Sequence, residues 1–123
     1  MQKKVQSFLL EFKKIASEKG IWLAPRPDSL ETLRYLRFTK KNLKEIILNL
    51  SATDYYQGPQ PDHTEKGEVW VFGKDLDGIE VYIKLKIVNE EMVKCLSFHI
   101  PVHPLSYPLR DMRKEKGLGR GKK

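Results

Sequence analysis

The chain has 123 residues, of which 40% are hydrophobic and 32% are charged. This length and balance are typical of one globular domain with a modest core, and they exclude a disordered chain. No apolar run approaches the ~20 residues of a membrane span, and the basic, then apolar start has no small-residue cleavage site. We therefore expect a cytoplasmic protein with no membrane partner.

The formal net charge of +7 is unevenly distributed. Residues 110–123 hold seven Lys and Arg and two Asp and Glu, so their net charge is +5 and residues 1–109 keep only +2. We expect a single domain over residues 1–109 and a flexible basic tail over residues 110–123. This glycine-containing tail either binds RNA or simply keeps the protein soluble.

The single cysteine, Cys95, excludes an internal disulfide, and no Cys/His spacing resembles a zinc site. His63 and His103 have no partner pattern for metal binding and are expected to be solvated loop residues. We therefore expect neither a metal nor a cofactor.

The first half of the chain predicts three helices. Apolar residues three and four positions apart indicate an amphipathic helix over residues 3–18. Residues 21–25 form a short apolar stretch typical of a strand. Asp28 or Ser29 is expected to cap the second helix, and Thr39 the third.

The second half predicts an antiparallel sheet. Ser51 is expected to cap a short turn, and residues 58–62 (GPQPD) to be irregular because proline fixes φ and lacks a donor. Alternating apolar residues then predict three strands, over residues 68–76, 79–88 and 93–101. The order of helices and strands indicates an α+β fold, with an antiparallel three- to four-stranded sheet and the N-terminal helices packed on one face.

Alternation divides the predicted sheet into an apolar and a polar face. The apolar face, which the helices should cover, holds Trp70, Phe72, Val81, Ile83, Leu85, Ile87, Leu96, Phe98 and Ile100. A turn at Glu90-Glu91 places three pairs on the polar face: Tyr82 with His99, Lys84 with Ser97, and Lys86 with Cys95.

The strong hairpin signal Asp77-Gly78 sets the register of the first two of these strands. In that register Gly73 lies beside Tyr82 and leaves a gap for another backbone or a ligand. Lys74 falls on the apolar face by strict alternation, unless Gly73 marks a bulge that turns it.

A tyrosine, a histidine and lysines on one open face suit metal-free RNA cleavage. The reaction needs a base for the ribose 2′-OH, cations for the phosphate and an acid for the leaving oxygen. His99 fits as acid or base, Lys84 and Lys86 fit as phosphate cations, and Tyr82 can stack on a base or donate its hydroxyl. The same side chains also pair across ordinary exposed strands for stability alone, and these residues by themselves favour that interpretation.

Four segments occur in an order that resembles a known family: LNLSATDYYQGPQPD, then VWVF, then GIEVYIKLKIV, then CLSFH. The sequence is similar to the MqsR family of type II toxins over about residues 5–100. The resemblance implies a RelE-like fold and a metal-independent, ribosome-independent mRNA interferase. It also implies a cognate antitoxin with a zinc-binding part and a helix-turn-helix part, and higher-order toxin–antitoxin complexes.

The resemblance also assigns site residues. The catalytic tyrosine of the family falls on Tyr82, and the lysine two residues later falls on Lys84. Three other family positions are changed here: a lysine is replaced by Gln57, a glutamine by Val71, and a second lysine by His99. His99 can take over acid–base chemistry, whereas Val71 cannot.

The predicted site therefore has a catalytic group and a binding group. The catalytic group is Tyr82, His99 and Lys84, and the RNA-binding group is Gln57, Tyr56, Lys86, Lys74 and Arg110. Two other functions fit the same fold, namely a non-catalytic RNA- or protein-binding module and a ribosome-dependent mRNA interferase.

Overall fold

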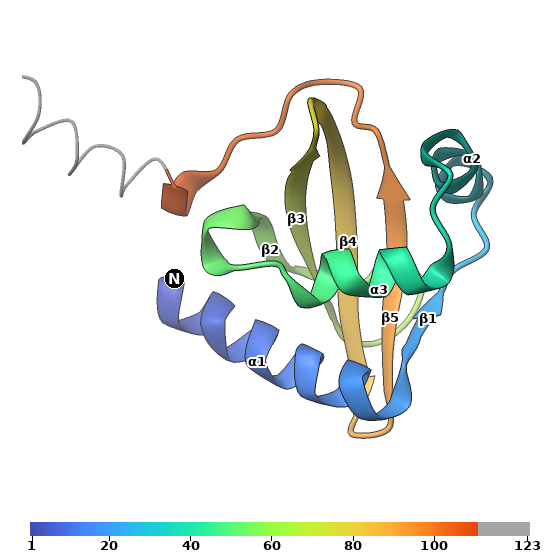
Figure 1. Cartoon of the computed structure of the whole chain (residues 1–123). Coiled ribbons are helices and arrows are strands. Elements are labelled where there is room, and N and C mark those ends of the chain that lie inside the picture. The colour runs from blue at the N-terminus through green and yellow to red at the C-terminus, as the bar shows by residue number, and fades with distance from the viewer. Residues whose placement is uncertain (111–123) are drawn as a thin grey trace, which may run out of the picture.

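The computed structural model describes residues 1–110, in which helices pack against one sheet (Figure 1). The predicted tail lies outside the described residues, apart from Arg110. The elements in chain order are α1 (Gln2–Lys19), β1 (Ile21–Leu23), α2 (Pro27–Leu36), α3 (Lys40–Leu48), the short 3₁₀ turn η1 (Ala52–Asp54), β2 (Tyr55–Pro61), β3 (Glu68–Leu76), β4 (Ile79–Asn89) and β5 (Met92–His99). Among the described residues, no helix is both long and apolar enough to cross a membrane.

The predicted α+β class is confirmed, but the sheet is larger than expected. It has five strands in the order β1-β5-β4-β3-β2, and β1 runs parallel to β5 while the other neighbours are antiparallel. The expectation of three or four antiparallel strands was therefore wrong. The prediction that residues 58–62 are irregular was also wrong, because most of this segment belongs to β2. That strand lies at the sheet edge and has two register shifts, which is where a sheet tolerates proline.

Local side chains explain where the helices begin. Thr39 caps α3 as predicted: its Oγ1 accepts from the backbone N–H of Asn42 at 3.2 Å, and Asn42 Oδ1 accepts from the Thr39 N–H at 2.9 Å. Helix α2 begins instead at Pro27 with no side-chain cap, so the expected cap at Asp28 or Ser29 was wrong. Proline suits this position because the first turn of a helix leaves its N–H groups unpaired.

Ser29 does not cap the helix; its hydroxyl instead forms a hydrogen bond with the edge of the sheet. Strand β1 ends at Leu23, so the second half of β5 has no strand neighbour on that side. There Ser29 Oγ accepts a hydrogen bond of 3.0 Å from the Phe98 backbone N–H. Helix α2 therefore covers an edge donor that would otherwise be free to pair with another chain.

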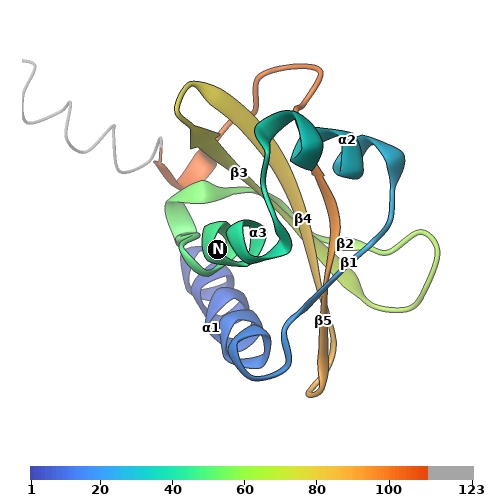
Figure 2. The same ribbon diagram turned by 45° about the vertical axis from the view of Figure 1, so that its right-hand side comes forward.

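The core lies between the helices and one face of the sheet. Figures 1 and 2 show α1 and α3 against this face, with α2 beside the end of β5. Its largest fully buried side chains include Phe12, Phe72, Phe98, Ile47 and Ile83. The prediction of an apolar face covered by the helices is thus confirmed for most of its residues. The exceptions are Ile100, which is exposed, and Leu96, which lies on the opposite face beside Lys84.

The opposite face is not open along its whole length. The segment after β5 packs over the Gly73 end of the sheet, and a Cβ atom built on Gly73 would lie 2.7 Å from Leu105 Cδ1 and in collision with the Tyr107 ring. Tyr107 donates its hydroxyl to Glu80 Oε2 at 2.5 Å, and the Leu105 N–H donates to Glu80 Oε1 at 3.0 Å. The chain itself fills the gap that Gly73 was expected to leave.

Candidate active site

Two rows of paired residues build the polar face of the sheet. One row joins Gly73, Tyr82 and His99 across β3, β4 and β5. The neighbouring row joins Val71, Lys84 and Ser97 across the same strands. The predicted pairs Tyr82–His99 and Lys84–Ser97 are therefore confirmed, and they bring all three predicted catalytic residues together.

Tyr82 and His99 form the centre of this face. Their rings stack with centroids 4.8 Å apart and planes inclined by 18°. Tyr56 from β2 meets the Tyr82 ring edge-on, with centroids 6.5 Å apart. Tyr55 is buried and Tyr56 half-buried, so the first of the two neighbouring tyrosines belongs to the core and the second borders the polar face.

The two ring nitrogens of His99 have different neighbours and therefore different roles. Nδ1 lies 3.2 Å from the Ile100 carbonyl oxygen, which can only accept, so this contact holds the proton on Nδ1. Nε2 is then left to accept a proton, and it lies 3.9 Å from Oδ2 of the exposed Asp28. In this tautomer His99 has the arrangement of a general base.

Burial shifts the pKa values of the other two catalytic candidates in opposite directions. Burial raises the pKa of Tyr82, and the neighbouring Tyr56 adds to this, so the Tyr82 hydroxyl keeps its proton near neutral pH. Burial lowers the pKa of Lys84, and the positive charge of Arg26 lowers it further. Tyr82 is thus suited to donate a proton or hydrogen bond, and Lys84 is a cation that is held close to a second cation.

That second cation, Arg26, was missed by reasoning from the sequence. It stands between β1 and α2, and its Nη1 lies 3.4 Å from Ser97 Oγ. The parallel pairing of β1 with β5 brings it there, because the chain leaves β1 beside the Ser97 end of β5. The motif Pro25-Arg26-Pro27 was visible, but only the strand pairing tells where its arginine lies.

A bulge in β5 corrects two predicted positions. Lys84 pairs with Ser97, but the next pair is Leu85 with Cys95, so Leu96 is an extra residue in β5. Cys95 therefore lies in the core with no exposed surface, where burial raises its thiol pKa to about 12. The predicted pair Lys86–Cys95 was wrong, since Lys86 lies opposite Lys94.

Lys86 lies under the connection between β2 and β3. Its side chain is only 3% exposed, and Nζ is 2.6 Å from both Asp62 Oδ2 and the Lys66 carbonyl oxygen. This pairing holds the pKa of Asp62 well below its usual range, with help from the Thr64 backbone N–H. RNA binding by Lys86 stays a prediction, and the buried ion pair weighs against it.

Lys74 and Arg110 meet at a different place, around the buried Asp54. Lys74 Nζ lies 3.3 Å from Asp54 Oδ2, and Arg110 Nη2 lies 3.0 Å from Asp54 Oδ1. No bulge occurs at Gly73, so Lys74 follows strict alternation and pairs with Val81. The structure therefore groups these two cations with η1 rather than with Tyr82.

Gln57 occupies the β2 end of the row that holds Lys84. It pairs with Val71, and its Oε1 accepts from Gln60 Nε2 at 2.7 Å. An amide there supplies no positive charge, so the cations beside the centre of the site come from Lys84 and Arg26.

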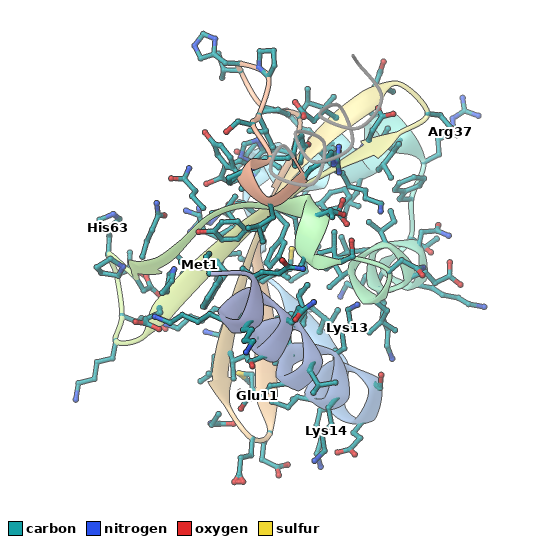
Figure 3. The ribbon with its side chains drawn as sticks, turned by 90° about the vertical axis from the view of Figure 1, so that its left-hand side faces the viewer. Met1, Glu11, Lys13, Lys14, Arg37 and His63 are labelled. Carbon is teal, nitrogen blue, oxygen red and sulfur yellow. The ribbon has the colours of Figure 1, made fainter. Side chains whose placement is uncertain are left out.

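A hollow of about 200 Å³ lies next to this centre, on the side away from Tyr107. Its lining includes Arg26, Lys84, Gln60, His63 and Leu96. His63 is exposed at the outer edge of the molecule, as expected of a loop histidine (Figure 3). Among residues 1–110, no three His, Cys, Asp or Glu side chains gather as they would to hold a metal ion.

A larger hollow, of about 700 Å³, lies on another side of the molecule. It is lined by the start of α1 and by residues near the beginning of β3, with the stacked rings of Phe8 and Trp70 at its apolar side. We place the candidate site beside the smaller hollow, because Lys84 and Arg26 line it and the row that holds Tyr82 and His99 is next to that of Lys84. None of these four residues lines the larger hollow.

The α+β arrangement, with helices on one face of the sheet and a Tyr–His–Lys group on the other, agrees with a RelE-like toxin domain. A family model described as "Motility quorum-sensing regulator, toxin of MqsA" matches residues 6–100, and the chain belongs to this MqsR toxin family. The protein is therefore the toxin of a toxin–antitoxin system, and its membership implies an antitoxin partner. No curated protein and no solved structure gives a significant match.

Proposed function

We propose that this toxin is an endoribonuclease that cleaves mRNA by attack of a ribose 2′-OH on the adjacent phosphate. The 2′ oxygen forms a new bond to phosphorus, and the bond from phosphorus to the 5′ oxygen breaks. The products are a 2′,3′-cyclic phosphate and a free 5′-OH. The reaction needs a base, an acid and cations at the phosphate, and no group outside the chain takes part in these proton transfers.

The stacked pair of Tyr82 and His99 supports this proposal most strongly. His99 Nε2 is the acceptor left by the contact of Nδ1 with the Ile100 carbonyl, so it takes the 2′-OH proton. The Tyr82 hydroxyl is protonated near neutral pH, as a tyrosine ordinarily is and as its raised pKa reinforces, so it has a proton to give to the leaving 5′ oxygen. The Lys84 ammonium, one row away, stabilises the charge that builds on the phosphate.

The antitoxin in this proposal has a zinc-binding part and a helix-turn-helix part, and it can assemble with the toxin into higher-order complexes. The substrate, mRNA, places the action of the toxin in the cytoplasm. Tyr56 joins the site through its contact with Tyr82 and can stack on an RNA base.

Induced expression tests the proposal in cells. The intact toxin should arrest growth, and both His99→Ala and Tyr82→Phe should relieve the arrest at equal soluble levels. His103→Ala and Tyr35→Phe are matched controls, because these residues are exposed and lie outside the site. Arrest by the two site variants as strong as that of the intact toxin would contradict the catalytic assignment. It would favour a binding module instead.

A further inference from the structure

The hollow beside the catalytic centre is bounded by two elements. Arg26 stands on one side, and the β2–β3 connection with Asp62, His63 and Thr64 stands on the other. Its volume of about 200 Å³ is several times the roughly 30 Å³ that one water occupies in the liquid. The space is therefore large enough for a phosphate group with part of its sugar.

Two cations line this hollow without a carboxylate partner. Within residues 1–110, neither Arg26 nor Lys84 has an Asp or Glu oxygen within 4.0 Å. The carboxylate of the hollow, Asp62, is already bound by the buried Lys86 at 2.6 Å. The local charge facing the hollow is thus positive, as an anion site requires.

Arg26 is also held in place for such a task. Its backbone N–H donates to the Ala24 carbonyl at 2.8 Å, and prolines on both sides restrict the main chain. Its guanidinium reaches Ser97 Oγ and leaves its remaining N–H groups for a ligand. A planar guanidinium matches two phosphate oxygens at once, whereas a lysine acts as a point charge.

The rest of the lining suits a nucleotide rather than a small ion. Leu96 and Val69 give the hollow an apolar side, and Gln60 adds an amide that can hydrogen-bond to a sugar or base. The bulge in β5 is what brings Leu96 to this face, next to Ser97 and Lys84. The hollow therefore combines cations, an amide and an apolar surface within reach of the row that holds Lys84.

We propose that this hollow binds the nucleotide next to the scissile bond of the RNA and holds its phosphate between Arg26 and Lys84. The inference rests on the proposed function for the identity of the ligand. It adds Arg26 as a substrate-binding residue. Arg26 would supply the positive charge that Gln57 cannot provide.

Binding of an oligonucleotide that cannot be cleaved tests this inference. A fluorescent 2′-O-methyl oligoribonucleotide has no free 2′-OH, so anisotropy reports binding alone. Arg26→Ala should weaken binding about tenfold, as expected for one lost charge-assisted contact. It should also reduce the slope of log affinity against log salt by about 0.7, the value for one phosphate of a single strand. Arg26→Lys should restore most of the slope but only part of the affinity.

Arg34→Ala is the matched control, because Arg34 is exposed on α2, the helix that directly follows Arg26, and does not line the hollow. Arg26→Ala should still fold, since its side chain does not cap α2, and thermal unfolding checks this. The inference is overturned if the intact toxin does not bind the oligonucleotide, or if Arg26→Ala keeps the slope of the intact toxin. An Arg26-dependent slope without any cleavage of RNA would support the phosphate site and contradict the proposed catalysis.

Discussion

The Tyr82 ring lies almost parallel to the His99 imidazole, with the two centroids 4.8 Å apart. The strand register produces this contact, because the two residues are directly opposed across β4 and β5. Stacking fixes the plane of the imidazole, and the contact with the Ile100 carbonyl fixes which nitrogen carries the proton. A base and a proton donor are thereby held side by side on a rigid element.

Tyr82→Phe should separate the chemistry of the hydroxyl from the stacking of the ring. Phenylalanine keeps the contact with His99, so we expect the free energy of unfolding to stay within about 0.5 kcal/mol. The rate of RNA cleavage should fall about 100-fold or more, as for loss of a general acid. Steady-state kinetics should show the loss in kcat with little change in KM. A variant with unchanged kcat would remove Tyr82 from the proton transfers.

Lys84→Arg should change how RNA binding depends on pH. Burial and Arg26 hold the pKa of Lys84 below its usual value, so its charge is lost as pH rises through a value lower than that of an exposed lysine. Affinity for a 2′-O-methyl oligonucleotide should therefore fall in alkaline solution. Arginine stays charged there, so Lys84→Arg should flatten this part of the profile. Equal profiles for the two proteins would show that Lys84 does not bind phosphate.

Gly73→Ala should loosen the segment that packs over the polar face. The new methyl group would collide with the Tyr107 ring and with Leu105, and Tyr107 is tied to Glu80. We expect a loss of about 1–3 kcal/mol in the free energy of unfolding, measured in urea. The same change in a Tyr107→Ala background should cost clearly less, because the main obstacle is gone. Equal costs in both backgrounds would mean that Tyr107 does not pack there in solution.

Replacing one member of the buried pair Lys86–Asp62 should reduce the free energy of unfolding more than replacing both members. Asp62→Asn leaves the Lys86 ammonium buried without its counter-ion, and we expect a loss of about 3 kcal/mol in unfolding free energy. Adding Lys86→Met removes the stranded charge and should recover part of that loss. A double variant that loses as much as the sum of the single variants would contradict the coupling.

The same pair predicts how stability depends on acid. Lys86 lowers the pKa of Asp62 in the folded protein, whereas aspartates of the unfolded chain titrate near about 3.9. As pH falls, Asp62 is therefore protonated in the unfolded chain before it is protonated in the folded protein. The stabilisation is complete above that pH and is lost as pH falls toward the folded pKa. Unfolding curves of Asp62→Asn should therefore change less between about pH 5 and pH 3 than those of the intact protein. The exposed Asp75→Asn is the control and should behave like the intact protein.

The strands that hold Tyr82 and His99 could be predicted because they carry strong local signals. Alternation continues through β3 and β4, and Asp77-Gly78 supplies the positive φ values of a tight hairpin, 55° and 92°. That hairpin sets the pairing of β3 with β4, and the turn expected at Glu90-Glu91 pairs Tyr82 with His99. Fold class and the centre of the site follow from them.

The remaining features depend on contacts between distant parts of the chain. β1 has three residues, so its parallel pairing with β5, and with it the place of Arg26, has no local signature. The bulge at Leu96 has no local sequence signal either. In residues 95–98 (CLSF), either Cys95 or Leu96 could face the core, and only the pairing with β4 decides between them. Lys86, Lys74 and Arg110 form ion pairs with Asp62 and Asp54, which are distant from them in the sequence, so no local pattern predicts these contacts.

The most direct test of the proposed chemistry is cleavage of a naked single-stranded RNA by the purified toxin, with chelator present and ribosomes absent. We expect products with a 2′,3′-cyclic phosphate and a 5′-OH, and no cleavage where a 2′-deoxy nucleotide replaces the attacked position. His99→Ala should lower the rate at least about 100-fold, while His103→Ala should leave it unchanged. Full activity of His99→Ala, or cleavage that occurs only on ribosomes, would contradict the proposed mechanism.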